Sequence, residues 1–204
     1  PNVKLELRLW SDSDVTQEYV NAHSISKAKY YSGSGARKFD RNTLADEIKR
    51  GQKKGDCFFY GIYQVNHNEL IGSIKIQGIN QKNKTSDVIP FIFNEKYFEY
   101  KLGSASIKLG TQMAFDAHDV RKVFGGIVKN NIGSVKTFLR AGWVVEGIRS
   151  GQFLEDDKPA DEILVACFNP KYFPKAHFDK KHISRMRPTL IISIVGVAKP
   201  HYVA

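Results

Sequence analysis

The sequence predicts an α/β fold in which helices flank a mixed, mostly antiparallel sheet. One observation is the alternation of apolar and polar residues over 3–9, the pattern of a half-buried strand. Another is the helical spacing of apolar residues over 104–118. Strand-like and helix-like segments are mixed along the chain, in an order that fits a sheet with helices packed on it.

The first half of the chain contains four expected strands and two expected helices. Asp12 and Asp14 can cap the first helix, and Asn42 precedes the second. Clusters of polar residues, such as Asn66-His67-Asn68, mark the turns between the strands. The predicted strands cover 3–9, 57–63, 70–76 and 87–93; the first helix ends near 23 and the second covers 44–52.

The second half is predicted to contain helices over 104–118 and 131–141, a strand over 122–128 and a hairpin across 143–168. Asn131 is a good N-cap because its side-chain oxygen can accept an N–H of the first helical turn. Phe138 and Leu139 follow Val135 at i+3 and i+4 and form one apolar face with it. Gly142 supplies the left-handed residue that ends the helix.

The pattern N-x-x-S…A-G-W-x-x-E-G, from Asn131 to Gly147, resembles the C-terminal half of the GNAT acyl-CoA N-acetyltransferase superfamily. The branch of ribosomal-protein and amino-sugar (surface-polysaccharide) N-acetyltransferases is the most similar. Further matches, which follow in family order, lie in 5–20, 58–76, 87–93, 107–115 and 155–161. The resemblance implies a six- or seven-stranded sheet, split near Phe93 for coenzyme A. It also implies a domain over 1–169, which leaves a basic extension over 170–204.

The resemblance implies acetyl-CoA as the acyl donor. Its pantetheine arm would lie along the strand over 87–93, and its pyrophosphate at the N-terminus of the helix over 104–118, where bare N–H groups attract anions. Family members usually have several glycines in the pyrophosphate loop, whereas this chain has only Gly103, with Lys101 as a candidate counter-charge. The residues assigned to the cofactor in this way are Ile92, Phe93, Asn94, Lys101, Leu102, Gly103, Ser104, Asn131 and Phe138.

Two residues are candidates for catalysis by the same resemblance. Asp87 begins the cofactor strand and could take the proton that the acceptor amine loses, although a strand-edge carboxylate in a salt bridge is the alternative. Ser134 fits the position of a polar group that faces the thioester sulfur, or it could bond back to a helix carbonyl. Many members carry a tyrosine acid where this chain has Phe138, which cannot donate a proton.

The resemblance favours a small-molecule primary amine as the acceptor, specifically an amino sugar, free or nucleotide-linked. Two alternatives stay open. One is a protein N-terminus or lysine as the acceptor, and the other is a catalytically impaired binding module with the same fold. No histidine lies at metal-ligand spacing from a cysteine or a carboxylate, so no metal site is expected.

The charge of the chain is uneven. Its 204 residues carry a net charge of +10, and residues 171–204 contribute seven Lys or Arg residues against Asp179 alone. Nucleic acid is therefore an alternative partner for the extension, although a solvated basic tail is favoured. A homodimer is also compatible with the sequence. Cys57 and Cys167 are expected to be free thiols, and the absence of a leader pattern or a membrane-length apolar run favours the cytoplasm.

Overall fold

The computed structural model describes residues 3–25, 40–93, 97 and 102–173. They form a seven-stranded sheet with the order β1-β2-β3-β4-β5-β7-β6, which confirms the predicted mixed, mostly antiparallel sheet. The strands are β1 (Leu5–Leu9), β2 (Cys57–Gln64), β3 (Glu69–Asn80), β4 (Thr85–Ile92), β5 (Lys122–Val128), β6 (Val144–Glu155) and β7 (Lys158–Phe168). The helices are the 3-10 turn η1 (Asp12–Asp14), α1 (Gln17–Ile25), α2 (Arg41–Lys54), α3 (Leu102–Ala117) and α4 (Ile132–Arg140).

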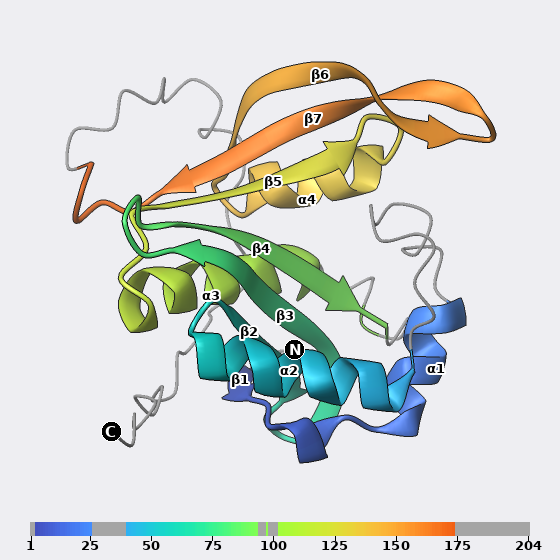
Figure 1. Ribbon diagram of the computed structural model, residues 1–204, viewed down its shortest axis with the longest axis vertical. Helices are drawn as coiled ribbons and strands as arrows, with labels where there is room; N and C mark the ends of the chain where they lie inside the picture. Colours follow the sequence, from blue (N-terminus) through green and yellow to red (C-terminus); the bar gives the residue numbers. More distant parts are fainter. Residues whose placement is uncertain (1–2, 26–39, 94–96, 98–101, 174–204) are drawn as a thin grey trace.

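Helices cover both faces of the sheet (Figure 1). α3 and α4 lie on one face, and their apolar residues join those of the sheet in a first core that includes Ile74, Met113 and Trp143. α1 and α2 lie on the other face and enclose a second core that includes Trp10 and Ile48. The predicted apolar face of α3 is confirmed, because its members Ile107, Leu109, Met113, Ala114 and Phe115 are all buried.

The helix ends follow local side-chain signals. α4 begins at the predicted cap, since Asn131 Oδ1 accepts the Ser134 N–H at 3.1 Å, and Gly142 beyond its end has a φ of 94°. The cap of α2 is a correction: Asp40 accepts the Thr43 N–H at 2.9 Å, so that Asn42 lies inside the first turn. Asp40 precedes Asn42 by two residues, and both are good caps, so the sequence alone does not choose between them.

The sheet splits between β4 and β5, the only parallel pair among the described strands. The two strands pair at Thr85 with Lys122, at Ser86 with Val123 and at Asp87 with Phe124, and then diverge (Figure 1). The split therefore begins at Asp87, earlier than the predicted position near Phe93. Pro90 gives a physical reason, because a proline has no N–H for a ladder and is tolerated where one strand edge is unpaired.

The residues that follow β7 still pack on the domain. Asn169 Nδ2 donates to Val120 O at 2.9 Å, Lys171 pairs with Asp119 at 2.7 Å, and the Phe173 ring meets Phe168 with centroids 5.2 Å apart. These contacts attach 170–173 to the domain. The remainder of the proposed basic extension lies outside the described residues.

Both cysteines are free thiols, Cys57 buried and Cys167 half-buried. Burial raises the pKa of each thiol to about 11, so neither is a ready nucleophile at neutral pH. Within the described ranges, none of the helices combines the length and the apolar character needed to cross a membrane.

Candidate active site

Asp87 lies where the sheet opens. Its Oδ2 accepts a long hydrogen bond of 3.4 Å from Gln77 Nε2, and its Oδ1 reaches toward β5, 3.5 Å from where a Cβ on Gly125 would stand. Burial raises the pKa of this carboxyl to about 6, against the opposing effects of the Gln77 hydrogen bond and the positive charge of Lys75. A carboxyl with a pKa near neutrality in an opening of the sheet is a candidate general base.

Glu162 of β7 is a second buried carboxylate at this opening, and the sequence analysis did not identify it. Arg149 Nη1 of β6 donates to Glu162 Oε2 at 2.9 Å, and only 7% of Glu162 is exposed. Its other oxygen, Oε1, occupies the place that a side chain on Gly126 would need. The Gly125-Gly126 pair inside an apolar strand is the sequence signal that could have pointed to this arrangement.

The two carboxylates belong to the same face of the sheet. Gln77 pairs with Asp87, and Lys75 pairs with Ile89, so that Asp87 shares its face with Lys75, which forms an ion pair with Glu47 of α2. Glu162 alternates with Ile163, which packs on the first core, and therefore points to the α2 face as well.

The residues predicted to lie along the cofactor arm divide between the two faces of the sheet. The Ile92 side chain packs on the first core. The Phe93 ring packs instead on the second core, 5.9 Å from Tyr19 and 6.1 Å from Phe91 between centroids. The predicted cofactor residue Asn94 lies outside the described residues, as does Lys101.

The first turn of α3 holds the remaining residues assigned to the pyrophosphate. Leu102 is fully buried and belongs to the first core, whereas Gly103 and Ser104 are partly exposed. A Cβ on Gly103 would stand 3.1 Å from Thr137 Cγ2 of α4. The glycine therefore permits the close approach of α3 to α4, in addition to any role toward a phosphate.

The first turn of α4 holds Asn131 and Ser134. The Asn131 side chain caps the helix, and no hydrogen bond of the Ser134 hydroxyl occurs within the described part of the chain. The residue that bonds back to a helix carbonyl is Thr137, whose hydroxyl donates to Gly133 O at 2.7 Å. Phe138 is buried in the first core with its ring edge-on to Trp143, which leaves little of it for a ligand.

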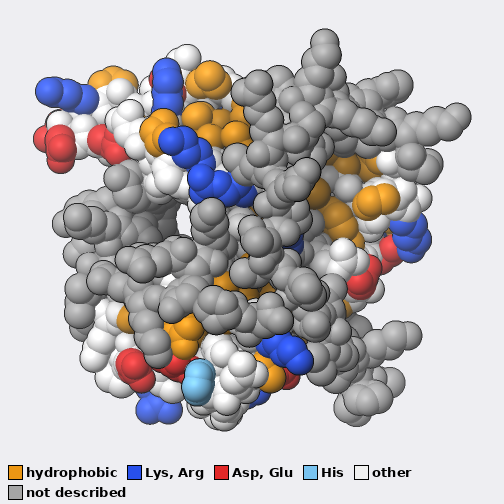
Figure 2. All heavy atoms as spheres, turned by 180° about the vertical axis from the view of Figure 1, so that it is seen from behind, with side chains coloured by type: hydrophobic (Ala, Val, Ile, Leu, Met, Phe, Trp, Pro, Cys, Tyr) orange, Lys and Arg blue, Asp and Glu red, His pale blue; other side chains and the backbone are white. Residues whose placement is uncertain are grey.

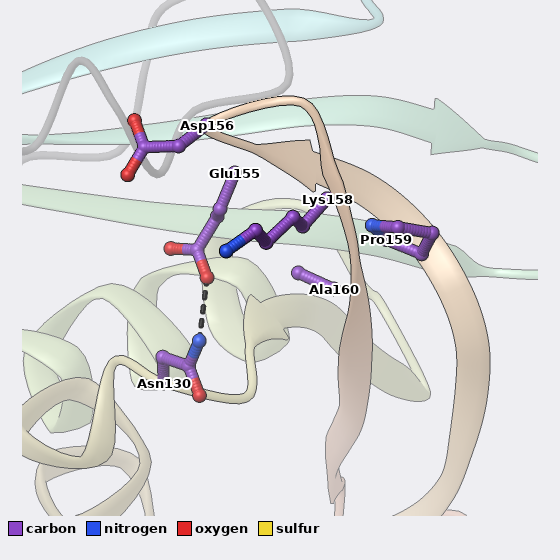
Figure 3. A pocket seen from close by; sticks show the side chains of 6 residues that line it. All are labelled: Asn130, Glu155, Asp156, Lys158, Pro159 and Ala160. Atoms are coloured by element: carbon purple, nitrogen blue, oxygen red, sulfur yellow. Dashed lines mark hydrogen bonds between the residues drawn. The ribbon is translucent and has the colours of Figure 1, made fainter.

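A polar pocket of about 410 Å³ lies at the far end of the β6–β7 hairpin (Figure 3). Asn130 Nδ2 donates to Glu155 Oε2 at 2.6 Å across it, and the Lys158 side chain points into the same space. Asp156, Pro159 and Ala160 complete the lining. Ala160 is two residues from Glu162 along β7 and shares its face of the strand, although Glu162 itself does not line the pocket.

The opening thus presents different chemistry on its two sides. The α2 face carries two carboxylates, one of them with a pKa near neutrality. The opposite face carries α3 and α4, whose first N–H groups suit anionic or polar groups. Between them, the edge of β4 beyond Asp87 is unpaired with β5, so its backbone groups can bind a ligand. This arrangement can bring a cation and a polyanion to one point.

Comparison with known proteins identifies relatives with this fold. A family model described as an acetyltransferase (GNAT) domain matches residues 10–164. The curated protein "Probable N-acetyltransferase YjcK" of Bacillus subtilis (strain 168) is 23% identical over 155 residues, which cover 76% of this chain and 83% of that protein.

Two solved structures illustrate the likeness in fold. Spermidine N-acetyltransferase from Vibrio cholerae, in complex with CoA and spermine, superposes with a TM-score of 0.72 at 15% identity, over 83% of this chain and 98% of that one. Ribosomal-protein-S5-alanine acetyltransferase from Vibrio fischeri superposes with a TM-score of 0.69 at 16% identity, over 81% of this chain and 93% of that one.

Proposed function

The chain belongs to the GNAT acetyltransferase family, and we propose that it acetylates a small cationic amine held beside Asp87 at the opening between β4 and β5. Membership makes the chain an N-acetyltransferase, and acetyl-CoA supplies the activated acetyl thioester when bound. The observation that carries the proposal is the position of Asp87. It is a half-buried carboxylate at the point where the two strands separate.

Asp87 is proposed as the general base. An amine attacks a thioester only in its neutral form, so a nearby group must accept the proton that the nitrogen loses. With a pKa of about 6, Asp87 is mostly ionised at neutral pH and is a stronger base than an ordinary aspartate. The hydrogen bond from Gln77 holds it in place, and this bond and the positive charge of Lys75 keep its pKa from rising further.

The acyl donor fits the unpaired edge of β4. The backbone groups of 88–92 that face β5 have no partner strand in the described part of the chain, and an extended arm such as pantetheine can use them. We propose that Gly103 and Ser104, in the first turn of α3, receive the pyrophosphate, and that Asn131 contacts the arm. Leu102 and Phe138 would support these residues from the core rather than touch the donor.

Ser134 is proposed as the polar group that faces the departing sulfur. Its hydroxyl lies in the first turn of α4, and its backbone N–H is held by the Asn131 side chain. A hydroxyl can donate a hydrogen bond to a developing thiolate, which Phe138 cannot do. The N-terminal end of α4 adds favourable partial charge near such an anion.

The nature of the acceptor is the finer part of the proposal. The sequence favours an amino sugar, while the Vibrio cholerae relative is a spermidine N-acetyltransferase. Both acceptors are cationic amines, and both would be attracted by the carboxylates on the α2 face. Self-association as a homodimer and a role for the basic extension stay predictions.

The proposal is tested with the purified full chain, acetyl-CoA and three acceptors: glucosamine, spermidine and a peptide with a free N-terminus. We expect acetyl-CoA to bind in calorimetry and an acetylated product to form with glucosamine or spermidine, identified by mass. Acetylation of the peptide alone would move the acceptor to proteins. Binding of acetyl-CoA without any product would favour the binding-module alternative.

A further inference from the structure

One glycine of β5, Gly126, makes room for a carboxylate at the opening, and its neighbour Gly125 lies beside another. Asp87 Oδ1 lies beside Gly125, at 3.5 Å from where its Cβ would be. Glu162 Oε1 lies over Gly126, where any Cβ would overlap it. Any larger residue at 126 would therefore displace the Glu162 carboxylate from its position at the opening.

Glu162 is fixed in this position although burying a carboxylate is costly. Its Oε2 is paired with Arg149, whose side chain is more than half exposed, while Oε1 makes no hydrogen bond within the described residues. Among the described residues, the fully buried side-chain polar atoms without a hydrogen-bond partner are Trp10 Nε1, Ser86 Oγ and Ser106 Oγ, so Glu162 Oε1 keeps some exposed surface that a ligand can reach. A ligand that supplies an N–H to Oε1 would form a charge-assisted hydrogen bond with it.

We propose that Glu162, held over Gly126 by Arg149, selects the acceptor by binding its ammonium or amine N–H group opposite Asp87. The inference rests on the proposed function and deepens it. The acceptor class that it names is cationic amines without an anionic group next to the nitrogen. Glu162 thereby positions the nitrogen, and Asp87 receives the proton.

The other charged groups around Asp87 leave the two carboxylates as the acceptor's partners. On β3, Lys75 is paired with Glu47 of α2, and on β5, Lys122 is paired with Glu146 of β6 at 2.7 Å. Arg149 of β6 is occupied by Glu162 itself. The cations on these elements are thus matched by acids, and Asp87 carries the one negative charge around the opening that no described cation pairs with.

The test compares Glu162→Gln, which keeps the shape and removes the charge, with Asp161→Asn as its matched control. Asp161 is the next residue on β7, and it is likewise ion-paired, to Lys129 at 2.9 Å. We expect Glu162→Gln to weaken binding of spermidine or glucosamine by about tenfold or more, the size of one charge-assisted hydrogen bond, with acetyl-CoA affinity unchanged. We expect Asp161→Asn to change neither affinity.

A pH profile provides a readout that a merely structural role would not move. Loss of the negative charge of Glu162 lowers the pKa of Asp87, so the acidic limb of kcat/KM should shift to lower pH in Glu162→Gln. The variant should also lose the preference of the wild type for glucosamine over an amine of similar size that carries a carboxylate. Glu162→Asp should recover part of both properties.

A second variant distinguishes loss of the Glu162 contact from a folding defect in Glu162→Gln. Gly126→Ala displaces the Glu162 carboxylate without deleting its charge, and we expect it to weaken amine binding as Glu162→Gln does. Equal amine affinity in wild type and in a folded Glu162→Gln variant, or equal losses in Asp161→Asn, would overturn the inference. Calorimetry measures amine binding without turnover, so the two proposals can fail separately. If the wild type is inactive but its amine affinity still depends on Glu162, the proposed function is refuted and the inference about Glu162 is not.

Discussion

The strands β1 to β4 and the strands β5 to β7 form two halves of one sheet that differ in burial. In β2, seven of the eight residues are buried, whereas β6 has no buried residue. Large apolar side chains of β6 reach the surface instead, with Ile148 57% and Leu154 71% exposed. Seen from behind, the upper part of the molecule, where β6 and α4 lie, shows apolar side chains at its surface (Figure 2).

The two halves contribute different residues to the site. Asp87 belongs to the first half, which is packed on both faces. Its strand β4 lies beside β3, contacts α3 on one face and packs into the second core through Phe91 on the other. Glu162 and Arg149 come from the half with one covered face and with two register shifts between β6 and β7. Three ladder pairs between β4 and β5 join the halves within the sheet, while the first core packs residues of both halves together. We therefore expect the chemistry to depend on the first half and the choice of acceptor on the second.

The largest expected effect is that of Asp87→Asn on activity. Loss of a general base should lower kcat/KM by about 10²- to 10⁴-fold. The same change should stabilise the fold at pH 7, because the raised pKa means that the ionised carboxyl costs folding free energy. This contribution favours the fold below the ordinary pKa of 3.8 and is lost as pH rises through about 6.

The stabilisation in Asp87→Asn should reach at most about 3 kcal/mol, less where solvent screens the carboxylate. It is measured by urea unfolding at pH 7, with Asp119→Asn as a control, because Asp119 is an ion-paired carboxylate on the surface. A variant that is less stable than wild type at pH 7, or as active, would remove Asp87 from the role of base.

The second prediction compares core residues of the two halves. Ile74 of β3 is fully buried and touches α3 at Gly110, so Ile74→Ala should cost about 2–5 kcal/mol of unfolding free energy. Ile148→Ala in β6 should stay within about 0.5 kcal/mol. Urea unfolding measures both. A large loss in Ile148→Ala would mean that another surface covers β6 in solution, for instance a second copy of the chain.

The third prediction concerns His118, which packs on the first half. Its ring lies on Phe58, with centroids 4.4 Å apart, and burial lowers its pKa to about 4. The fold is therefore favoured above the ordinary pKa of 6.5, and this stability is lost as pH falls through about 4. Between pH 7 and pH 5 the loss should be about 2 kcal/mol.

Asp87 has the opposite pH dependence over the same range, so the His118 effect is best measured in the Asp87→Asn background. There, His118→Gln should flatten the dependence of unfolding free energy on pH, and His67→Gln, at an exposed turn, should leave it unchanged. Equal slopes in the two variants would show that His118 is protonated as readily in the folded as in the unfolded chain.

Local signals explain what could be predicted from the sequence. The bounds of β5 and the cap of α4 were predicted correctly because a short apolar run and an Asn residue at a helix start act within a few residues. The start of the split was misplaced because it depends on where the ladder between β4 and β5 ends, which is a property of two distant segments.

The candidate site was less predictable for the same reason. Asp87 was identified from the family resemblance, as the first residue of the predicted cofactor strand, but Glu162 becomes relevant only when β7 lies between β5 and β6. In sequence, it is one of several acids in the last hairpin. Its pairing with Arg149 and its contact with Gly126 join three strands, which no local pattern encodes.

The smallest expected effect tests the contact between the helices of the two halves. In Gly103→Ala, the new methyl group would press on Thr137 Cγ2, while the loss of glycine favours the helix, so stability should change by about 1 kcal/mol or less. Acetyl-CoA affinity should fall by about tenfold, because the methyl group also occupies the place where a phosphate approaches the backbone.

Thr137→Ser separates the two roles of Gly103, because it removes Cγ2 and keeps the hydroxyl that donates to Gly133 O. In the double variant Gly103→Ala with Thr137→Ser, the steric contact is relieved, so stability should return to that of Thr137→Ser alone. Affinity for acetyl-CoA, measured by calorimetry, should stay reduced if the backbone at 103 receives the pyrophosphate. Recovery of both quantities together would instead show that Gly103 serves only the packing of α3 on α4, and that the pyrophosphate binds elsewhere.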